Sequence, residues 1–240
     1  MNQHEFEIAI SKARFEKYLI VSNHDFDKAF QLYILNLELS KSIFGILSIY
    51  EITLRNAINY HYINYLNDEN WIVNQCKEGG IFNRPNDPNQ YYSLKKIKKV
   101  QMKLNQKCSN DRLVAELSLG FWVYLFASYQ FKAGGQNLHQ IFINRPKGTK
   151  PKTLFYELNQ IRLLRNRIAH HEAICFNKKS DLNPLFLQPN MEFIIKHFYW
   201  LAKDELLVKM KIYDYQQHVH SIIHFYDSIK SPIQSNFYAI

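Results

Sequence analysis

The sequence has little cysteine, proline or glycine, with 3 Cys, 7 Pro and 7 Gly in 240 residues. The three cysteines, Cys76, Cys108 and Cys175, form no Cys-x-x-Cys pair and no zinc-ligand spacing, which excludes a disulfide-rich or zinc-ribbon domain and fits a reducing compartment. The chain also lacks an uninterrupted apolar run of about 18 residues, and its N-terminus is too acidic for a signal peptide. We therefore expect a cytoplasmic protein with no membrane partner.

Positive charge and aromatic side chains are abundant instead. Lys and Arg outnumber Asp and Glu by 30 to 21, which gives a formal net charge of +9. An excess of basic residues favours an anionic partner, and nucleic acid is the commonest one, although ordinary solubility charge is the alternative. The aromatic share of 15% lies mostly in helix-like segments, so core packing is its default explanation.

Apolar residues recur at helical spacing along most of the chain. From about residue 25 to Leu66 the pattern is almost continuous, with Asp25 or Asp27 as the N-cap and Ser40 dividing it into two antiparallel helices. Further helices are expected over residues 11–19 with Ser11 as the N-cap, over 91–107, over 111–131 with Asp111 as the N-cap, over 153–172 and from about 189 to 229.

Alternating β-branched runs are missing, so the sequence predicts an all-α fold. We expect one helical-bundle domain over residues 1–240, with an ordered core from about 11 to 230 that ends before Pro232. Stretches rich in Gly, Pro, Asn and Asp predict irregular insertions at about 67–90, 132–152 and 176–189.

Two basic stretches are candidate RNA-binding surfaces. The helix expected over 91–107 has an apolar stripe and many lysines but no acidic residue, and the segment 144–152 is also basic. A solvated helix face or a membrane-surface contact are the alternatives for that helix. The candidate RNA-binding residues, including two arginines from the segment described next, are Lys95, Lys96, Lys98, Lys99, Lys103, Lys147, Lys150, Lys152, Arg162 and Arg167.

The residues best suited to catalysis lie in the segment NQIRLLRNRIAHHEAICFN, residues 159–177. Asn166 and His170 are four positions apart, so they share one helix face, and the long side chain of Arg165 can swing to the same cleft. Histidine transfers protons near neutral pH, arginine grips phosphate, and asparagine orients the histidine or donates to a phosphate oxygen. The structural alternative is an Arg and a His that cap or bridge neighbouring helices.

This set of groups suits the cleavage of RNA, because RNA carries its own nucleophile. A base that deprotonates the 2′-OH drives in-line attack on the adjacent phosphorus, and the products are a 2′,3′-cyclic phosphate and a 5′-OH. The reaction needs no metal, and we expect no metal site and no cofactor because the sequence has no carboxylate cluster or His/Cys set at ligand spacing.

The string Arg165-Asn166-x-x-Ala169-His170-His171-Glu172 resembles the signature helix of Abi-like (abortive infection, AbiD/AbiF-type) proteins, which carry a HEPN Arg-x4-His motif. The resemblance covers roughly residues 11–230. It extends to ARFEKYL near the N-terminus, to the long segment that follows with Asn36, Ser40 and Glu51-x-x-Leu54-Arg55-Asn56, and to Gly120-Phe121-Trp122.

This resemblance implies a HEPN-like helical bundle, a role in phage defence or as a toxin, and RNA as substrate or bound partner. It places the catalytic motif on Arg165, Asn166 and His170. Many HEPN ribonucleases build one cleft from two motifs that face each other across a dimer. One motif per chain therefore implies a homodimer.

Other polar residues are expected to support this site. Arg55-Asn56 echoes Arg165-Asn166, but the next histidine, His61, lies about 240° round the helix from Arg55, so no second motif forms. Glu51, Arg55 and Asn56 therefore support the first site or form a buried polar network, in which Glu51 and Arg55 are spaced to pair. His171 lies about 100° from His170 and could assist, cap or pack.

Three functions compete on these observations. The leading one is a metal-independent endoribonuclease of abortive infection or of a toxin–antitoxin-like system. The second is a non-catalytic RNA-binding protein that holds a structured partner RNA. The third is a protein–protein regulator that uses the helical fold as a dimer module.

Overall fold

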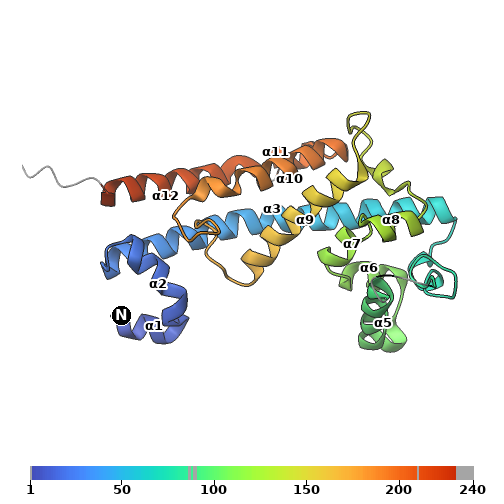
Figure 1. Ribbon diagram of the computed structural model, residues 1–240, viewed down its shortest axis with the longest axis horizontal. Coiled ribbons are helices and arrows are strands. Elements are labelled where there is room, and N and C mark those ends of the chain that lie inside the picture. The colour runs from blue at the N-terminus through green and yellow to red at the C-terminus, as the bar shows by residue number, and fades with distance from the viewer. Residues whose placement is uncertain (1, 86–87, 89–90, 210, 231–240) are drawn as a thin grey trace, which may run out of the picture. The chain divides into compact units, whose positions relative to one another are not determined.

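The computed structural model describes residues 2–85, 88, 91–209 and 211–230, and the predicted end of order at Pro232 lies outside these residues. Within them all regular structure is helical, apart from one isolated antiparallel bridge between Phe176 and Leu182. The prediction of an all-α fold is therefore confirmed. The helices (Figure 1) are α1 Gln3–Ile10, α2 Lys12–Val21, α3 Phe26–Leu66, α4 Trp71–Asn74, α5 Tyr92–Leu104, η1 Asn105–Lys107, α6 Asn110–Glu116, α7 Leu119–Tyr124, α8 Ser128–Ala133, η2 Leu138–Ile141, α9 Pro151–Ala169, η3 Pro184–Leu187, α10 Gln188–Trp200, α11 Glu205–Lys209, η4 Ile212–Asp214 and α12 Tyr215–Lys230.

The chain folds into two compact units. The first unit comprises residues 1–46, 166–189 and 211–240, and the second comprises residues 47–165 and 190–210. Helices α3 and α9 each contribute to both units, because the division falls after Ile46 and after Arg165. The assignment of residues 1–240 to a single domain stays a prediction.

The helix α3 is continuous over 41 residues, so the predicted break at Ser40 is wrong. Asp25 accepts the Lys28 N–H at 3.1 Å and caps the helix, as predicted. The Ser40 hydroxyl donates to the Asn36 carbonyl at 2.8 Å, so the serine is satisfied inside the helix and does not end it.

Among the described helices, α3 alone is long and apolar enough to cross a membrane by length and composition. The core helix of a folded protein passes the same test, and Leu39, Ile43, Leu47 and Leu54 of α3 are fully buried. That the protein has no membrane partner stays a prediction.

The first unit has an aromatic core that fixes the two N-terminal helices on α3. The Phe6 ring packs edge-on against Phe15, Phe30 and Tyr33, with ring centroids 4.9, 5.1 and 5.4 Å apart. The helix α1 was not predicted, yet Asn2 and Glu5 form a complete capping box at its start.

Asn36 fastens the segment that follows α9 to α3 in this unit. Its buried side-chain oxygen accepts the N–H groups of Ile174 and Cys175 at 2.9 and 3.1 Å. Beside it, Phe176 packs edge-on against Tyr18 of α2 at 5.3 Å. The end of α9 is therefore held against both α2 and α3.

The second unit departs from the prediction over residues 111–131. One helix was expected there, but three short helices form, α6, α7 and α8, and Ser109, not Asp111, caps the first of them. The Trp122 indole donates to the Leu117 carbonyl at 3.0 Å. This bond satisfies a carbonyl where α6 ends, so the chain can turn without leaving it unpaired.

The remaining predicted elements lie close to their expected places. The basic amphipathic helix forms as α5 and η1, with Leu94 and Ile97 buried and Val100 and Leu104 half-buried. The helix expected over 153–172 is α9, which begins at Pro151 and ends at Ala169. Ser11 precedes α2 but makes no side-chain capping bond. The stretches predicted to be irregular contain the short helices α4, η2 and η3.

Candidate active site at the end of α9

The chain turns sharply where α9 ends. His171 has φ of 56°, in the left-handed region. The N–H of His171 donates to the Ile168 carbonyl at 2.9 Å and the N–H of Glu172 donates to the Arg167 carbonyl at 2.9 Å. This pair of bonds is a Schellman motif, which satisfies carbonyls that the helix end would leave open. Of the three roles predicted for His171, its backbone therefore performs capping.

Arg167 braces the same turn through its side chain. Its guanidinium pairs with Glu172 at 3.2 Å and donates to the carbonyls of Ala173 and Phe176 at 2.9 and 3.1 Å. Three contacts from one planar group fix the path of the chain for nine residues after it. The predicted RNA-binding role of Arg167 would have to share the guanidinium with these bonds.

His170 comes directly after the last residue of α9. Its N–H still makes a helical hydrogen bond, to the Asn166 carbonyl at 2.9 Å. Its side chain is exposed and makes no hydrogen bond to any described residue. It lines a pocket of about 300 Å³ that lies within the first unit. The helix α2 contributes Arg14, Lys17 and Tyr18 to the walls, and α3 contributes Tyr33.

The pocket around His170 is basic. Arg14, Lys17 and Arg167 line it, against one carboxylate, Glu172, which is already paired with Arg167. Arg14 and Lys17 form no ion pair with a described residue, and they are three positions apart, so they share a face of α2. Two cations beside an accessible imidazole form a site for an anionic group such as a phosphate.

Two buried titratable side chains, Tyr18 and Cys175, lie beside this pocket. Burial raises the pKa of the Tyr18 phenol well above its usual value, and burial raises the pKa of the Cys175 thiol to about 12. The Tyr18 phenol and the Cys175 thiol are therefore uncharged at neutral pH. Within the described residues, no three His, Cys, Asp or Glu side chains gather as metal ligands would.

Arg165 lies in the second unit and has a carboxylate partner there. Its guanidinium pairs with Glu51 of α3 at 3.3 Å, and a third of the Arg165 side chain is exposed. The other oxygen of Glu51 accepts the Leu119 N–H at 2.9 Å, at the first turn of α7. Glu51 therefore joins α3, α7 and α9 in one polar network and holds the arginine side chain.

The family to which this chain belongs follows from its sequence. The model of the family described as "Abi-like protein" matches residues 2–175, almost three quarters of the 240 residues. The chain belongs to the Abi-like family. No curated protein and no solved structure matches it. Membership supports a role in abortive infection, and the matched range of this Abi-like protein includes α2, α3 and α9, which build the pocket around His170.

Arg55 and Asn56, which were predicted to support the site in this Abi-like protein, do not line the pocket around His170. The Arg55 guanidinium donates to the Ala115 carbonyl at 3.1 Å, so the expected pair with Glu51 is not formed. Asn56 is exposed and lines a second pocket, together with His61. Asn166 is half-buried, one helical turn before His170. Glu51 binds Arg165 and Arg55 binds a backbone carbonyl, so the two residues do not bond to each other, and a supporting role for either of them stays a prediction.

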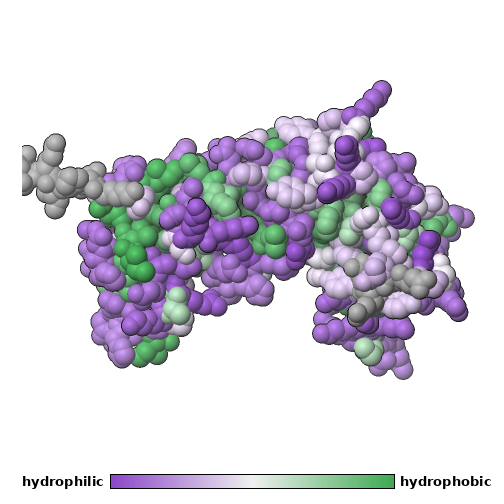
Figure 2. Space-filling model, in the orientation of Figure 1, coloured by the Kyte–Doolittle hydropathy of each residue, from purple (hydrophilic) through white to green (hydrophobic). Residues whose placement is uncertain are grey.

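The predicted RNA-binding lysines of the Abi-like protein are all exposed and belong to the second unit. Figure 2 shows hydrophilic side chains over α5, at the lower right. Lys103 pairs with Glu116 at 2.6 Å, and Lys96 lies over the Tyr92 ring. Arg162 donates to Asn159 at 3.0 Å. The remaining lysines, which form no ion pair with a described residue, are Lys95, Lys98, Lys99, Lys147, Lys150 and Lys152.

Sequence analysis missed Arg14 and Lys17 as site residues, although a signal for them exists. In ARFEKYL, Arg14, Lys17 and Tyr18 stand at positions i, i+3 and i+4, which is one face of a helix. That face was read only as part of the family resemblance. The spacing alone would have predicted a basic helix face with an aromatic residue beside it.

A buried network in the second unit was missed as well. His197 is fully buried, with one ring nitrogen 2.6 Å from the Tyr50 hydroxyl and the other 2.8 Å from the Glu157 carboxylate, which also binds Lys196 at 2.7 Å. A carboxylate only accepts, so Nε2 donates to Glu157 and Nδ1 accepts from Tyr50. A neutral imidazole thus satisfies every group. These residues come from α3, α9 and α10, and no spacing signal joins them.

Proposed function

We propose that this Abi-like protein is a cytoplasmic, metal-independent endoribonuclease that acts in abortive infection or in a toxin–antitoxin-like system. The observation that carries the proposal is the accessible His170 in a pocket with Arg14 and Lys17. An imidazole that moves protons and cations that bind phosphate are what cleavage by the 2′-OH requires.

The reaction is a transesterification, in which the bond from phosphorus to O5′ is replaced by a bond from phosphorus to the 2′-oxygen. A base takes the proton of the 2′-OH, the 2′-oxygen bonds to phosphorus, and the bond from phosphorus to O5′ breaks. An acid gives a proton to the departing O5′. The products are a 2′,3′-cyclic phosphate and a 5′-OH, and no other reactant is consumed.

Each group of the site has a role in this proposal. His170 serves as the acid or the base, because its ring makes no hydrogen bond to a described residue. Arg14 and Lys17 hold the scissile phosphate or its neighbour. Arg165 and Asn166 keep the catalytic roles that the motif predicts, with Arg165 held by Glu51 until RNA competes for its guanidinium.

The chemistry needs an acid and a base, and the motif supplies one histidine of the Arg-x4-His kind per chain. We therefore propose a homodimer in which each chain contributes one His170. Light scattering on the purified protein should give a mass near twice 28.7 kDa. A strict monomer that still cuts RNA would require a second proton-transfer group within the chain.

The product ends test the proposed reaction directly. Full-length protein is incubated with single-stranded RNA in EDTA, and the ends of the fragments are identified. We expect 2′,3′-cyclic phosphate and 5′-OH ends, and no cut where the 2′-OH next to the scissile phosphate is replaced by hydrogen. Fragments with 5′-phosphate ends, or cleavage only after Mg²⁺ is added, would refute the proposed mechanism.

A second candidate function rests on α5, whose exposed lysines have no acidic residue among them. In this second function the protein binds RNA without cutting it and holds a structured partner RNA. Binding would persist without cleavage, and the affinity would fall steeply with salt as phosphate contacts release counterions. Binding and cleavage measured on the same RNA at several salt concentrations separate the two functions.

A further inference from the structure

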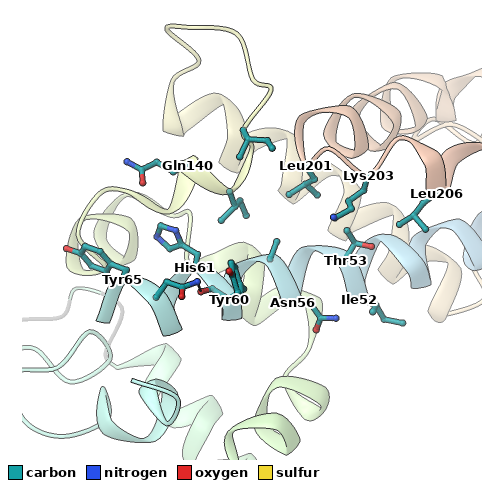
Figure 3. A pocket seen from close by; sticks show the side chains of 14 residues that line it. Ile52, Thr53, Asn56, Tyr60, His61, Tyr65, Gln140, Leu201, Lys203 and Leu206 are labelled. Carbon is teal, nitrogen blue, oxygen red and sulfur yellow. Dashed lines mark hydrogen bonds between the residues drawn. The ribbon is translucent and has the colours of Figure 1, made fainter. Parts of the chain in front are cut away.

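A second pocket, outside the proposed active site, lies entirely within the second unit. It has a volume of about 880 Å³, and one face of α3 forms much of its lining. The other walls come from η2 with Ile143 just after it, from residues that join α10 to α11, and from Leu206 of α11 (Figure 3). The proposed cleavage reaction uses none of these residues.

The pocket contains aromatic rings that the fold does not bury. Tyr60 is 71% exposed and Tyr65 is 51% exposed, and the Tyr60 ring packs against no other described aromatic ring. Side chains of this size are rarely left in water without a partner when they gather in a hollow. Burial in the core therefore does not explain these two tyrosines.

One of the two rings belongs to a preformed stacking platform. The ring of Tyr65 lies parallel to that of His61, with centroids 6.0 Å apart and 13° between the planes. His61 is in turn held by Asn137 at 2.9 Å and by the edge of Tyr62. A platform that is rigid before binding loses little entropy when a flat ligand stacks on it.

Polar groups lie along the same face. The Asn56 and Gln140 side chains make no hydrogen bond to a described residue, and amides of this kind read the edges of nucleobases. Lys203 lines the pocket and forms no ion pair with a described residue. In Figure 3, Tyr65, His61 and Gln140 lie towards one end of the row, whereas Lys203 and Thr53 lie towards the other.

We propose that this pocket binds unpaired nucleobases of a single-stranded RNA segment. The bases stack on Tyr65 and Tyr60, amides contact their edges, and Lys203 contacts a phosphate. From Thr53 to Tyr65 the helix rises about 18 Å, at 1.5 Å per residue, which is long for one nucleotide and suits a short strand. The choice of RNA rests on the proposed function, and the pocket adds a base-contacting site to it.

The test measures RNA affinity in the full-length protein with His170→Ala, so that no RNA is cut. The anisotropy of a labelled 12-nucleotide single-stranded RNA reports binding. Tyr60→Ala should weaken binding by about 5-fold to 150-fold, since stacking contributes about 1–3 kcal/mol per base. Lys203→Ala should weaken it and reduce the salt dependence by about one phosphate contact.

Tyr213→Ala is the control, because Tyr213 is also an exposed tyrosine, at 51% against 71% for Tyr60, and belongs to the first unit. It should leave the affinity within about 2-fold of the parent. Unchanged affinity in Tyr60→Ala, or equally tight binding of a duplex of the same length, would overturn the proposal. A loss of dimer in Tyr60→Ala with RNA affinity intact would also overturn it, because the face would then join two copies of the chain.

Competition with free mononucleotides shows whether the pocket binds an RNA strand or a single free nucleotide, since both carry a base and a phosphate. Displacement of the RNA by millimolar AMP or GMP only supports the strand as the ligand, whereas displacement at micromolar concentration assigns the pocket to a free nucleotide and overturns the strand. Binding that depends on Tyr60 in a protein that never cuts RNA would refute the proposed nuclease and leave this pocket intact. Cleavage of RNA by the wild-type protein, together with RNA affinity that Tyr60→Ala does not change, would support the nuclease and overturn the pocket.

Discussion

Two histidines of this protein differ in every physical respect that matters for function. His170 directly follows α9 and belongs to the first unit, with an exposed ring that makes no hydrogen bond to a described residue. His197 lies in the second unit, fully buried, with both ring nitrogens bonded. A buried and fully bonded imidazole holds helices together, whereas an accessible one beside cations can move a proton. His197 therefore has a structural role, whereas His170 is suited to catalysis, and variants of the two residues or of their neighbours should differ accordingly.

The largest expected effect on stability comes from the buried side. His197→Ala should lower the free energy of unfolding by about 3–5 kcal/mol, because it removes a buried ring and leaves the Tyr50 hydroxyl and one oxygen of Glu157 without their partner. Denaturant unfolding measures the change, and His170→Ala is the matched control, expected within about 0.5 kcal/mol of the wild type. Equal stability of the two variants would end the distinction between the histidines.

The same histidine predicts how stability depends on pH. Burial holds the pKa of His197 below its ordinary value of about 6.5. The unfolded chain therefore binds a proton as pH falls through 6.5, while the folded chain does not, and the free energy of unfolding should fall as the pH drops from 7 towards 5. His197→Ala should flatten this slope. A slope that His197→Ala shares with the wild type would assign it to other groups.

The smallest effect concerns the turn beside the exposed histidine. His171 adopts a left-handed conformation that glycine takes without strain, so His171→Gly should stabilise the protein by about 0.5–1 kcal/mol. Thermal unfolding measures the gain, and RNA cleavage should persist if the backbone of His171 is what the turn needs. Loss of cleavage in this variant would give the His171 side chain a role in the reaction.

The spacing of apolar residues predicts where long helices form, because that spacing is a local property of the sequence. The apolar spacing predicts α5 and α9 with small errors at their ends. It predicts that α3 is helical along its length, but the break expected at Ser40 does not form. The apolar run at 111–131 is equally regular, yet it breaks because Trp122 bonds the Leu117 carbonyl and Glu51 bonds the Leu119 N–H. Glu51 comes from a distant part of the sequence, and a helical pattern carries no information about it.

The same limit applies to the candidate site. The string around His170 is contiguous, so its residues could be named from the sequence. The contribution of α2 depends on the fold, since Asn36 and Arg167 hold the end of α9 where Arg14 and Lys17 can line the pocket with it. The pair of Arg165 with Glu51 likewise joins two helices, although Glu51 had been predicted to pair with Arg55.

The most direct measurement is RNA cleavage in EDTA by the full-length protein, by His170→Ala and by His4→Ala, an exposed histidine on α1. Loss of a general acid or base costs about 100-fold to 10,000-fold in rate, so His170→Ala should fall by at least that lower factor while His4→Ala cuts at the rate of the wild type. Wild-type rates in a stable, folded His170→Ala protein would contradict the assignment of His170 as the proton-transfer group.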